Sequence, residues 1–260
     1  MILHYLAIDT VCAVLAWSLL ADRLVGTGPH ALSFAWTGAG VWLVYVADRW
    51  LDSLPGSTEL KPGARHRFAA RHRQSLGIAW IIVWSVSVAS ALVVLSGEIL
   101  LAGTFVAALA IGYLLIIQRI PSKNESGKLR AGGGLAVGIL VATAANLFPA
   151  IEGAASPWIK IIVWLLTAWA FFLQTRCTRL WEEGETIPWL WLLIFTIVGA
   201  LAAIVLGEIP AAVAVVSLAL CILVVDFLKI RDKVAVADWI LALAGACGWI
   251  TALMTGAWGG

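Results

Sequence analysis

Residues 210–229 read PAAVAVVSLALCILVVDFLK, and no charged side chain interrupts this stretch before Asp226. A helix needs about 20 predominantly apolar residues to cross a lipid bilayer, so a stretch of this length and character predicts a membrane span. Comparable stretches recur from one end of the chain to the other. The sequence predicts nine spans, at residues 3–21, 31–51, 76–96, 98–118, 131–149, 157–181, 188–206, 210–229 and 234–257.

The composition of the 260-residue chain agrees with this prediction. Hydrophobic residues make up 62% of the chain and charged residues 12%, whereas soluble domains contain about 25% charged residues. A membrane β-barrel would require alternating segments of about ten residues, and the sequence has none. The four cysteines lie within apolar stretches without paired or metal-like spacing, which argues against a disulfide framework. We expect an all-α polytopic membrane protein in which residues 1–260 form a single domain.

Lysine and arginine are distributed unevenly over the predicted loops. Only Arg23 and Lys160 lie on the side opposite the N-terminus. The N-terminal side holds the other 15 of the 17 basic residues: Arg49, Lys61, Arg65, Arg67, Arg71, Arg73, Arg119, Lys123, Lys128, Arg130, Arg176, Arg179, Lys229, Arg231 and Lys233. Because cytoplasmic loops are enriched in Lys and Arg, we expect the N-terminus inside and the C-terminus outside, in a membrane such as the bacterial inner membrane. The longest polar loop is predicted at residues 53–75.

Acidic side chains gather at the end of the second predicted span, where residues 44–52 read VYVADRWLD. Asp48 and Asp52 are four residues apart, so a helix places both carboxylates on one face, with Tyr45 about one turn earlier. Two negative charges this close repel each other unless a cation lies between them. Mg²⁺ fits, because it bridges carboxylates to substrate phosphates. The alternative is a solvated helix end with two exposed acids.

The sixth predicted span carries a second charged surface. Aromatic and then charged residues recur on it at helical spacing: Trp169, Phe172, Arg176, Arg179 and Glu183. Arg176 falls inside the expected membrane interface, where a guanidinium needs an anionic partner or a water-filled cavity. A phosphate meets this need because arginine binds it through two parallel hydrogen bonds. The alternative for both arginines is that they extend toward the lipid headgroups.

Other charged groups have less specific interpretations. Glu182 and Glu183 belong to an acidic cluster on the otherwise basic side, which suits a metal-bridged polyanion. Lys128 precedes the glycine run at residues 132–134 and adds a cation to the same side. The basic run at residues 65–73 is suited either to closing over a diphosphate or to contacting anionic lipid.

Three more acids lie in or beside predicted spans. Asp9, Asp226 and Asp238 mark either a proton or ion pathway or a set of structural ion pairs. The last two lie close in sequence to the cations of residues 229–233, which favours structural ion pairs.

The layout of nine spans, an internal N-terminus, an aspartate pair and a charged patch resembles that of the UbiA superfamily of intramembrane prenyltransferases. The first aspartate-rich motif of that family, NDxxDxxxD, is similar to residues 44–52: Asp48 and Asp52 are kept, while Val44 and Tyr45 replace the opening Asn and Asp.

Two other segments are similar to the family. Tyr113 and Arg119 match its tyrosine-containing fourth helix, with Gln118 where lysine is usual. The second aspartate motif is poorly kept, and residues 184–188 (GETIP) resemble only the turn that follows it.

The resemblance implies a UbiA-like bundle around a central cavity, in which Asp48 and Asp52 bind a prenyl diphosphate through Mg²⁺ and Arg119 contacts the diphosphate. The implied reaction transfers the prenyl group to an aromatic or lipid acceptor. The alternatives are cyclisation of the prenyl chain and a non-catalytic lipid-binding or transport protein, and no nucleic acid is expected as partner. Local chemistry adds Tyr45 as a catalytic residue, Arg49, Lys128, Arg176 and Arg179 at the diphosphate, and Glu182 and Glu183 at the metal.

Overall fold

The computed structural model describes residues 6–27, 30–52, 64–119, 127–182, 189–205, 209–227 and 233–254. Within these ranges the chain is helical and contains no strand. The helices are α2 (Ile8–Val25), α3 (Ala31–Asp52), α4 (Ala64–Arg71), α5 (Arg73–Val94), α6 (Gly97–Arg119), α7 (Gly127–Ala145), α8 (Leu147–Glu152), α9 (Pro157–Glu182), α10 (Trp189–Val205), α11 (Ile209–Phe227) and α12 (Lys233–Met254).

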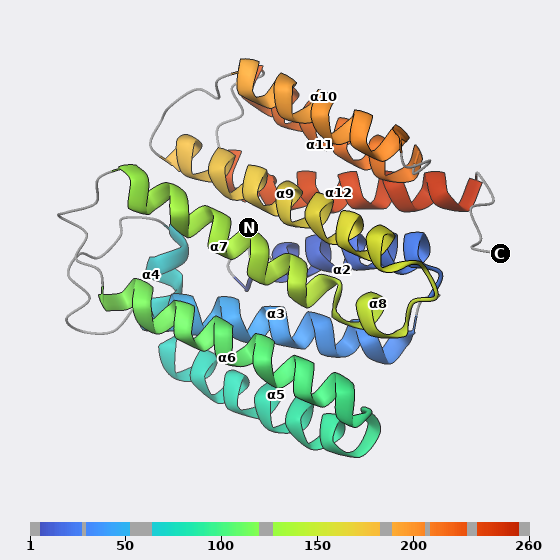
Figure 1. Cartoon of the computed structure of the whole chain (residues 1–260). Helices are drawn as coiled ribbons and strands as arrows, with labels where there is room; N and C mark the ends of the chain where they lie inside the picture. Colours follow the sequence, from blue (N-terminus) through green and yellow to red (C-terminus); the bar gives the residue numbers. More distant parts are fainter. Residues whose placement is uncertain are drawn as a thin grey trace.

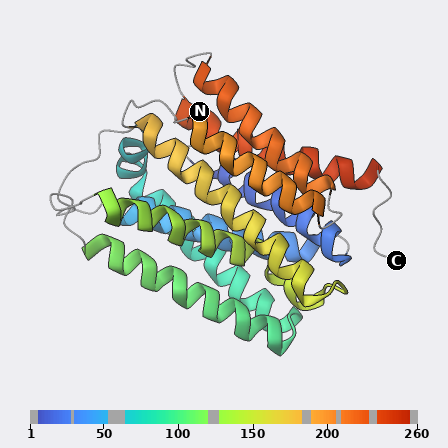
Figure 2. The ribbon, with the colours of Figure 1, turned by 45° about the horizontal axis from the view of Figure 1, so that its top comes forward.

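The long helices lie side by side in a bundle, with the short helices α4 and α8 at opposite ends (Figures 1 and 2). Helix α12 packs against α2 and α11, and α9 packs chiefly against α7. On the other side of the bundle α3 contacts α2, α5, α6 and α7. Glycine and proline residues explain where some of the helices begin or end. Gly26 ends α2 in the left-handed region (φ 73°) with its N–H bonded to the Asp22 carbonyl, and proline begins α9.

Five helices are long and apolar enough to cross a membrane within the described residues. The apolar segments are Arg73–Val94, Gly97–Ile116, Pro157–Thr178, Ile209–Asp226 and Val236–Met254. Helix α2 carries Asp9, Asp22 and Arg23, and α3 ends in a charged turn, so both are more polar than these five. Length and composition therefore make the chain an integral membrane protein. The count of nine spans stays a prediction, although each predicted range overlaps a long described helix.

The main core lies between α2, α9, α11 and α12 and includes Trp17, Phe171, Leu218 and Leu241. By contrast, the most apolar part of α5 contains no buried residue. Its exposed side chains include Ile81, Val86 and Val93, and a lipid bilayer covers such a surface without cost.

Two predicted boundaries were wrong. Residues 131–149 were expected to form one span, but the chain breaks at Asn146 and continues as the short helix α8. Pro149 accounts for the break, because it has no N–H to donate to the carbonyl of Ala145 and its ring crowds the preceding turn. Residues 53–75 were expected to form a polar loop, whereas Ala64–Arg71 forms α4 and α5 begins at Arg73. The buried Ala69 anchors α4 in a small apolar cluster with Val46.

Candidate functional site

The end of α3 holds four of the predicted site residues: Tyr45, Asp48, Arg49 and Asp52. Tyr45 and Asp48 are half-buried, and Arg49 is only 6% exposed. The guanidinium carbon of Arg49 lies 5.9 Å from the centre of the Tyr45 ring, within the range of a cation–π contact. Arg49 is therefore almost fully enclosed by the surrounding protein. Trp50, the next residue, stacks against a different cation, since the Arg73 guanidinium lies 5.1 Å from its ring.

The backbone of α3 carries the predicted acidic pair in helical register. The helix continues to Asp52, so its Cα and that of Asp48 are one turn apart on one face. Glu183 lies outside the described residues. The side chains of several other predicted residues also lie outside the described part of the structure, although their backbones are helical: Asp52, Arg119, Lys128, Arg179 and Glu182.

Helix α9 carries the second predicted surface, which divides into two parts. Trp169 and Phe172 are half-buried, with ring centres 5.4 Å apart, and Phe172 lies against the backbone of α7 at Gly138. Arg176, one turn further on, is exposed. Among the described residues α3 and α9 do not pack along their length. Helices α2 and α7 contact both of them, and α7 lies between them in Figures 1 and 2. Tyr45 and Trp169 pack on the same core cluster.

A buried polar cluster joins three helices at this same end of the bundle. Asp238 on α12 is 7% exposed and accepts two hydrogen bonds of 2.6 Å, from Oγ1 of Thr10 on α2 and from Nε2 of Gln174 on α9. The Thr10 N–H donates to the fully buried Asp9 carboxylate at 3.0 Å. A buried carboxylate is tolerated when it is hydrogen-bonded in this way. Asp238 therefore fixes the relative positions of α2, α9 and α12.

The sequence predicted ion pairs with the cations of residues 229–233 for Asp226 and Asp238 and gave no partner for Asp9. Residues 228–232 lie outside the described residues, so these ion pairs stay a prediction. Thr10 and Gln174 were not predicted, because neither residue is charged. The one available signal was their position, since both are hydrogen-bonding side chains inside apolar stretches. Asp226 also has an uncharged partner, because its Oδ1 accepts a 3.0 Å hydrogen bond from the indole of Trp181 on α9.

Replacing Thr10 by valine is expected to destabilise the protein by about 1.5–3 kcal/mol. Valine keeps the shape of threonine but removes the hydroxyl that donates to a buried carboxylate. Thermal unfolding of the detergent-solubilised protein measures the effect. Thr104→Val is the matched control, since Thr104 is exposed and its hydroxyl bonds only the carbonyl of Leu100 in its own helix. Equal melting temperatures for the two variants would contradict this role for Thr10.

The described residues contain no group of three or more histidine, cysteine, aspartate or glutamate side chains that could hold a metal ion. Asp48 supplies one carboxylate at the end of α3. The other three carboxylates of the predicted magnesium site (Asp52, Glu182 and Glu183) fall outside the described side chains. Carboxylate oxygens are the ligands that a hard divalent cation such as Mg²⁺ prefers. The magnesium site stays a prediction.

Comparisons with known proteins identify no relative of this chain. No protein-family model, no curated protein and no solved structure matches the chain. The case for a function therefore depends on the residues of the chain and on their arrangement.

Proposed function

We propose that this protein is a Mg²⁺-dependent intramembrane enzyme of the UbiA type, which ionises a prenyl diphosphate and transfers the prenyl group to an aromatic or lipid acceptor. The observation that carries the proposal is the gathering of polar groups at one end of an otherwise apolar bundle. Tyr45, Asp48 and Arg49 end α3 there, and Gln174 and Asp238 lie buried at the same end.

The proposal takes all nine long helices as membrane spans and the end of α3 as cytoplasmic. The positive-inside rule supports this orientation, because 15 of the 17 Lys and Arg residues belong to that side. A soluble prenyl diphosphate then meets the protein at the charged end, while its apolar tail enters the bundle. Exposed cations at this end, such as Arg176, raise the local concentration of an anionic substrate.

Each group has a distinct role in the proposed reaction. Asp48 and Asp52, with Glu182 and Glu183, would hold Mg²⁺, which would neutralise the diphosphate and stabilise it as a leaving group. Five cations would contact the diphosphate oxygens: Arg49, Arg119, Lys128, Arg176 and Arg179.

The reaction breaks the carbon–oxygen bond to the diphosphate, which leaves with the bonding electron pair, and the acceptor captures the allylic cation and loses a proton. In this proposal the Tyr45 ring faces the allylic cation, and the Arg49 guanidinium carbon lies 5.9 Å from the centre of the ring. The apolar core excludes water, which would otherwise capture the cation.

The test is magnesium-dependent release of diphosphate. The purified chain in lipid nanodiscs is incubated with geranyl, farnesyl and geranylgeranyl diphosphate, with Mg²⁺ or with EDTA, and released diphosphate is measured. We expect release with Mg²⁺ and none with EDTA. Mass spectrometry of the organic product distinguishes transfer to an added acceptor from cyclisation of the prenyl chain. Absence of magnesium-dependent release with all three substrates would overturn the proposal and favour a non-catalytic lipid-binding or transport protein.

A further inference from the structure

The basic run at residues 65–73 has no role in the proposed reaction. Residues 60–97 contain five Lys and Arg residues but no Asp or Glu. The run forms most of α4 and leads into α5, which is long and apolar enough to cross a membrane. A basic run beside a membrane span contacts either lipid headgroups or a soluble anion, and the packing of α4 distinguishes between the two.

Helix α4 packs on a face of α3 that lies away from Asp48. The buried Ala69 of α4 belongs to a small apolar cluster with Val46 of α3. Asp48 follows Val46 by two residues, and two residues turn an α-helix by about 200°, so Asp48 lies on nearly the opposite face. Tyr45 lies on the Asp48 side and packs on the main core instead. The position of α4 therefore does not suit closure over a diphosphate held at Asp48.

The start of α5 packs on the same face of α3 as α4. Trp50 follows Val46 by one turn, and the guanidinium carbon of Arg73 lies 5.1 Å from the centre of its ring. Arg73 is half-buried and contributes to the packing between α3 and α5. Among the described side chains, the exposed arginines of the run are Arg67 and Arg71.

Arg67 and Arg71 form one cationic face of α4. They are four residues apart, so their side chains lie one turn apart on the same side of the helix. Ala69, midway between them in sequence, is buried on the other side. Arginine binds phosphate through two parallel hydrogen bonds, and two arginines at this spacing provide a surface for one phosphate headgroup or for two neighbouring ones.

An apolar surface on α5 follows this cationic face. Ile78, Ile81 and Ile82 are each more than half exposed. Ile78 lies five residues after the first residue of α5, which is about 7.5 Å along the helix axis. A cationic helix followed at this distance by exposed apolar side chains matches an amphiphile with an anionic head and an apolar tail.

We propose that Arg67 and Arg71 bind the phosphate headgroup of an anionic phospholipid whose acyl chains lie along α5. A zwitterionic phospholipid carries the same phosphate, but the guanidiniums repel the ammonium group of its headgroup. The inference does not depend on the proposed reaction, because neither arginine belongs to the proposed magnesium or diphosphate site. Its test measures lipid binding and needs no enzymatic activity.

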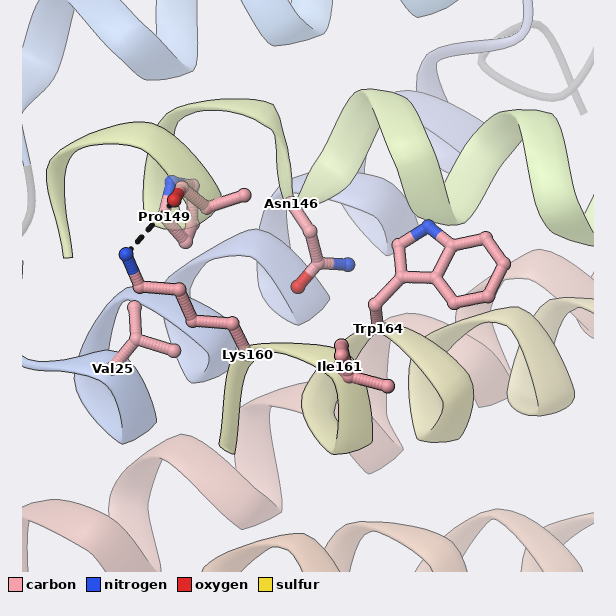
Figure 3. Close-up of a pocket in the computed structure, with 7 residues that line it drawn as sticks. Val25, Asn146, Pro149, Lys160, Ile161 and Trp164 are labelled. Carbon is pink, nitrogen blue, oxygen red and sulfur yellow. Dashed lines mark hydrogen bonds between the residues drawn. The ribbon is translucent and has the colours of Figure 1, made fainter. Parts of the chain in front are cut away.

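The opposite end of the bundle provides a matched control cation. Lys160 lines a cavity of about 190 Å³, formed where α9 begins and where α7 gives way to α8 (Figure 3). Its Nζ donates a 2.9 Å hydrogen bond to the carbonyl of Ala150, drawn as the dashed line in Figure 3. Lys160 is the one charged side chain among the described residues that line this cavity. It therefore lacks the paired arrangement of the two arginines on α4.

The experiment is native mass spectrometry of the delipidated full chain in detergent, with an equimolar mixture of dioleoyl-phosphatidylglycerol and dioleoyl-phosphatidylcholine. The two probes have the same acyl chains and differ only in the headgroup. We expect the phosphatidylglycerol adduct to exceed the phosphatidylcholine adduct by about 25-fold, since each basic residue at an anionic headgroup contributes about fivefold.

Three variants assign the preference to α4. The double variant Arg67→Gln with Arg71→Gln removes both charges and is expected to bring the two adducts to nearly equal amounts. Arg67→Lys with Arg71→Lys retains the charges and is expected to keep the preference within about threefold of the original. Lys160→Gln removes one charge at the other end of the bundle and is expected to leave the preference unchanged. Because both arginines are exposed, we expect their variants to fold, and thermal unfolding checks this.

Four results would overturn the proposal. Equal binding of the two lipids would mean that only the acyl chains bind. A preference that survives in the double glutamine variant would place the lipid elsewhere, and an equal loss in Lys160→Gln would indicate a general effect of net charge. The fourth result is displacement of phosphatidylglycerol by inorganic diphosphate in EDTA, beyond that caused by chloride at the same ionic strength. It would mean that the basic run binds a soluble anion.

Discussion

Asp48→Asn is expected to lower magnesium-dependent diphosphate release at least about hundredfold, which is the usual loss when one electrostatic group is removed from a reacting centre. Asparagine has the size of aspartate and still offers an oxygen ligand. It lacks the negative charge, which is the property that attracts a hard divalent cation and determines its affinity. The half-buried position of Asp48 strengthens the effect, because its charge is screened less than that of a fully exposed acid.

The measurement is the rate of diphosphate release at several Mg²⁺ concentrations, with the folded fraction checked by thermal unfolding. Asp48→Glu retains the charge at a displaced position, so we expect partial activity that recovers as the Mg²⁺ concentration rises. Asp226→Asn is the matched control: it makes the same chemical change at the same end of the bundle, and its amide oxygen still accepts the hydrogen bond from Trp181. Loss of equal size in Asp48→Asn and Asp226→Asn would indicate a general effect of charge and would contradict a metal-binding role for Asp48.

The helices of this protein could be predicted well because each one is specified locally. An apolar stretch of about 20 residues has one favourable conformation in lipid, since a helix satisfies its own backbone hydrogen bonds. The predictions were wrong where a proline or a tertiary contact overrode the preference set by the composition of a segment. Pro149 broke a continuous apolar stretch into α7 and α8, and α4 formed in a polar segment because Ala69 and Phe68 give that segment a partly buried face.

For the candidate site, helical periodicity predicts only which residues share one face of a helix. The spacing of Tyr45, Asp48 and Asp52 determines that they share a face of α3, whatever the rest of the chain does. Periodicity does not determine which helix lies opposite that face. The prediction paired α3 with α9, whereas the described part of the structure packs each of them against α2 and α7.

Sequence patterns do not predict hydrogen bonds between residues far apart in the chain. Thr10 and Asp238 are separated by 228 residues, and their contact depends on the packing of α2 against α12.

The packing of α12 leads to the second large expected effect, which is the loss of stability on replacing Gly248 by alanine. A Cβ at this position would lie 2.8 Å from the Cβ of Ala214 and 2.9 Å from both the Pro210 carbonyl oxygen and a methyl of Leu20. Two of these three atoms are backbone or next to it and cannot rotate away. Small residues at such contacts let membrane helices approach closely, and overpacking a core costs about 1–3 kcal/mol for each substitution.

Gly112→Ala is the matched control, because Gly112 also lies inside a helix but a Cβ there meets no atom within 4 Å. Alanine stabilises a helix interior by about 1 kcal/mol relative to glycine, so Gly112→Ala is expected to raise the melting temperature. The same substitution at Gly248 is expected to lower it, because the clash with α2 and α11 outweighs the gain in helix propensity. Gly248→Val enlarges the clash and is expected to prevent purification of folded protein. A rise in melting temperature for Gly248→Ala equal to that of the control would mean that α12 does not pack closely against α2 and α11.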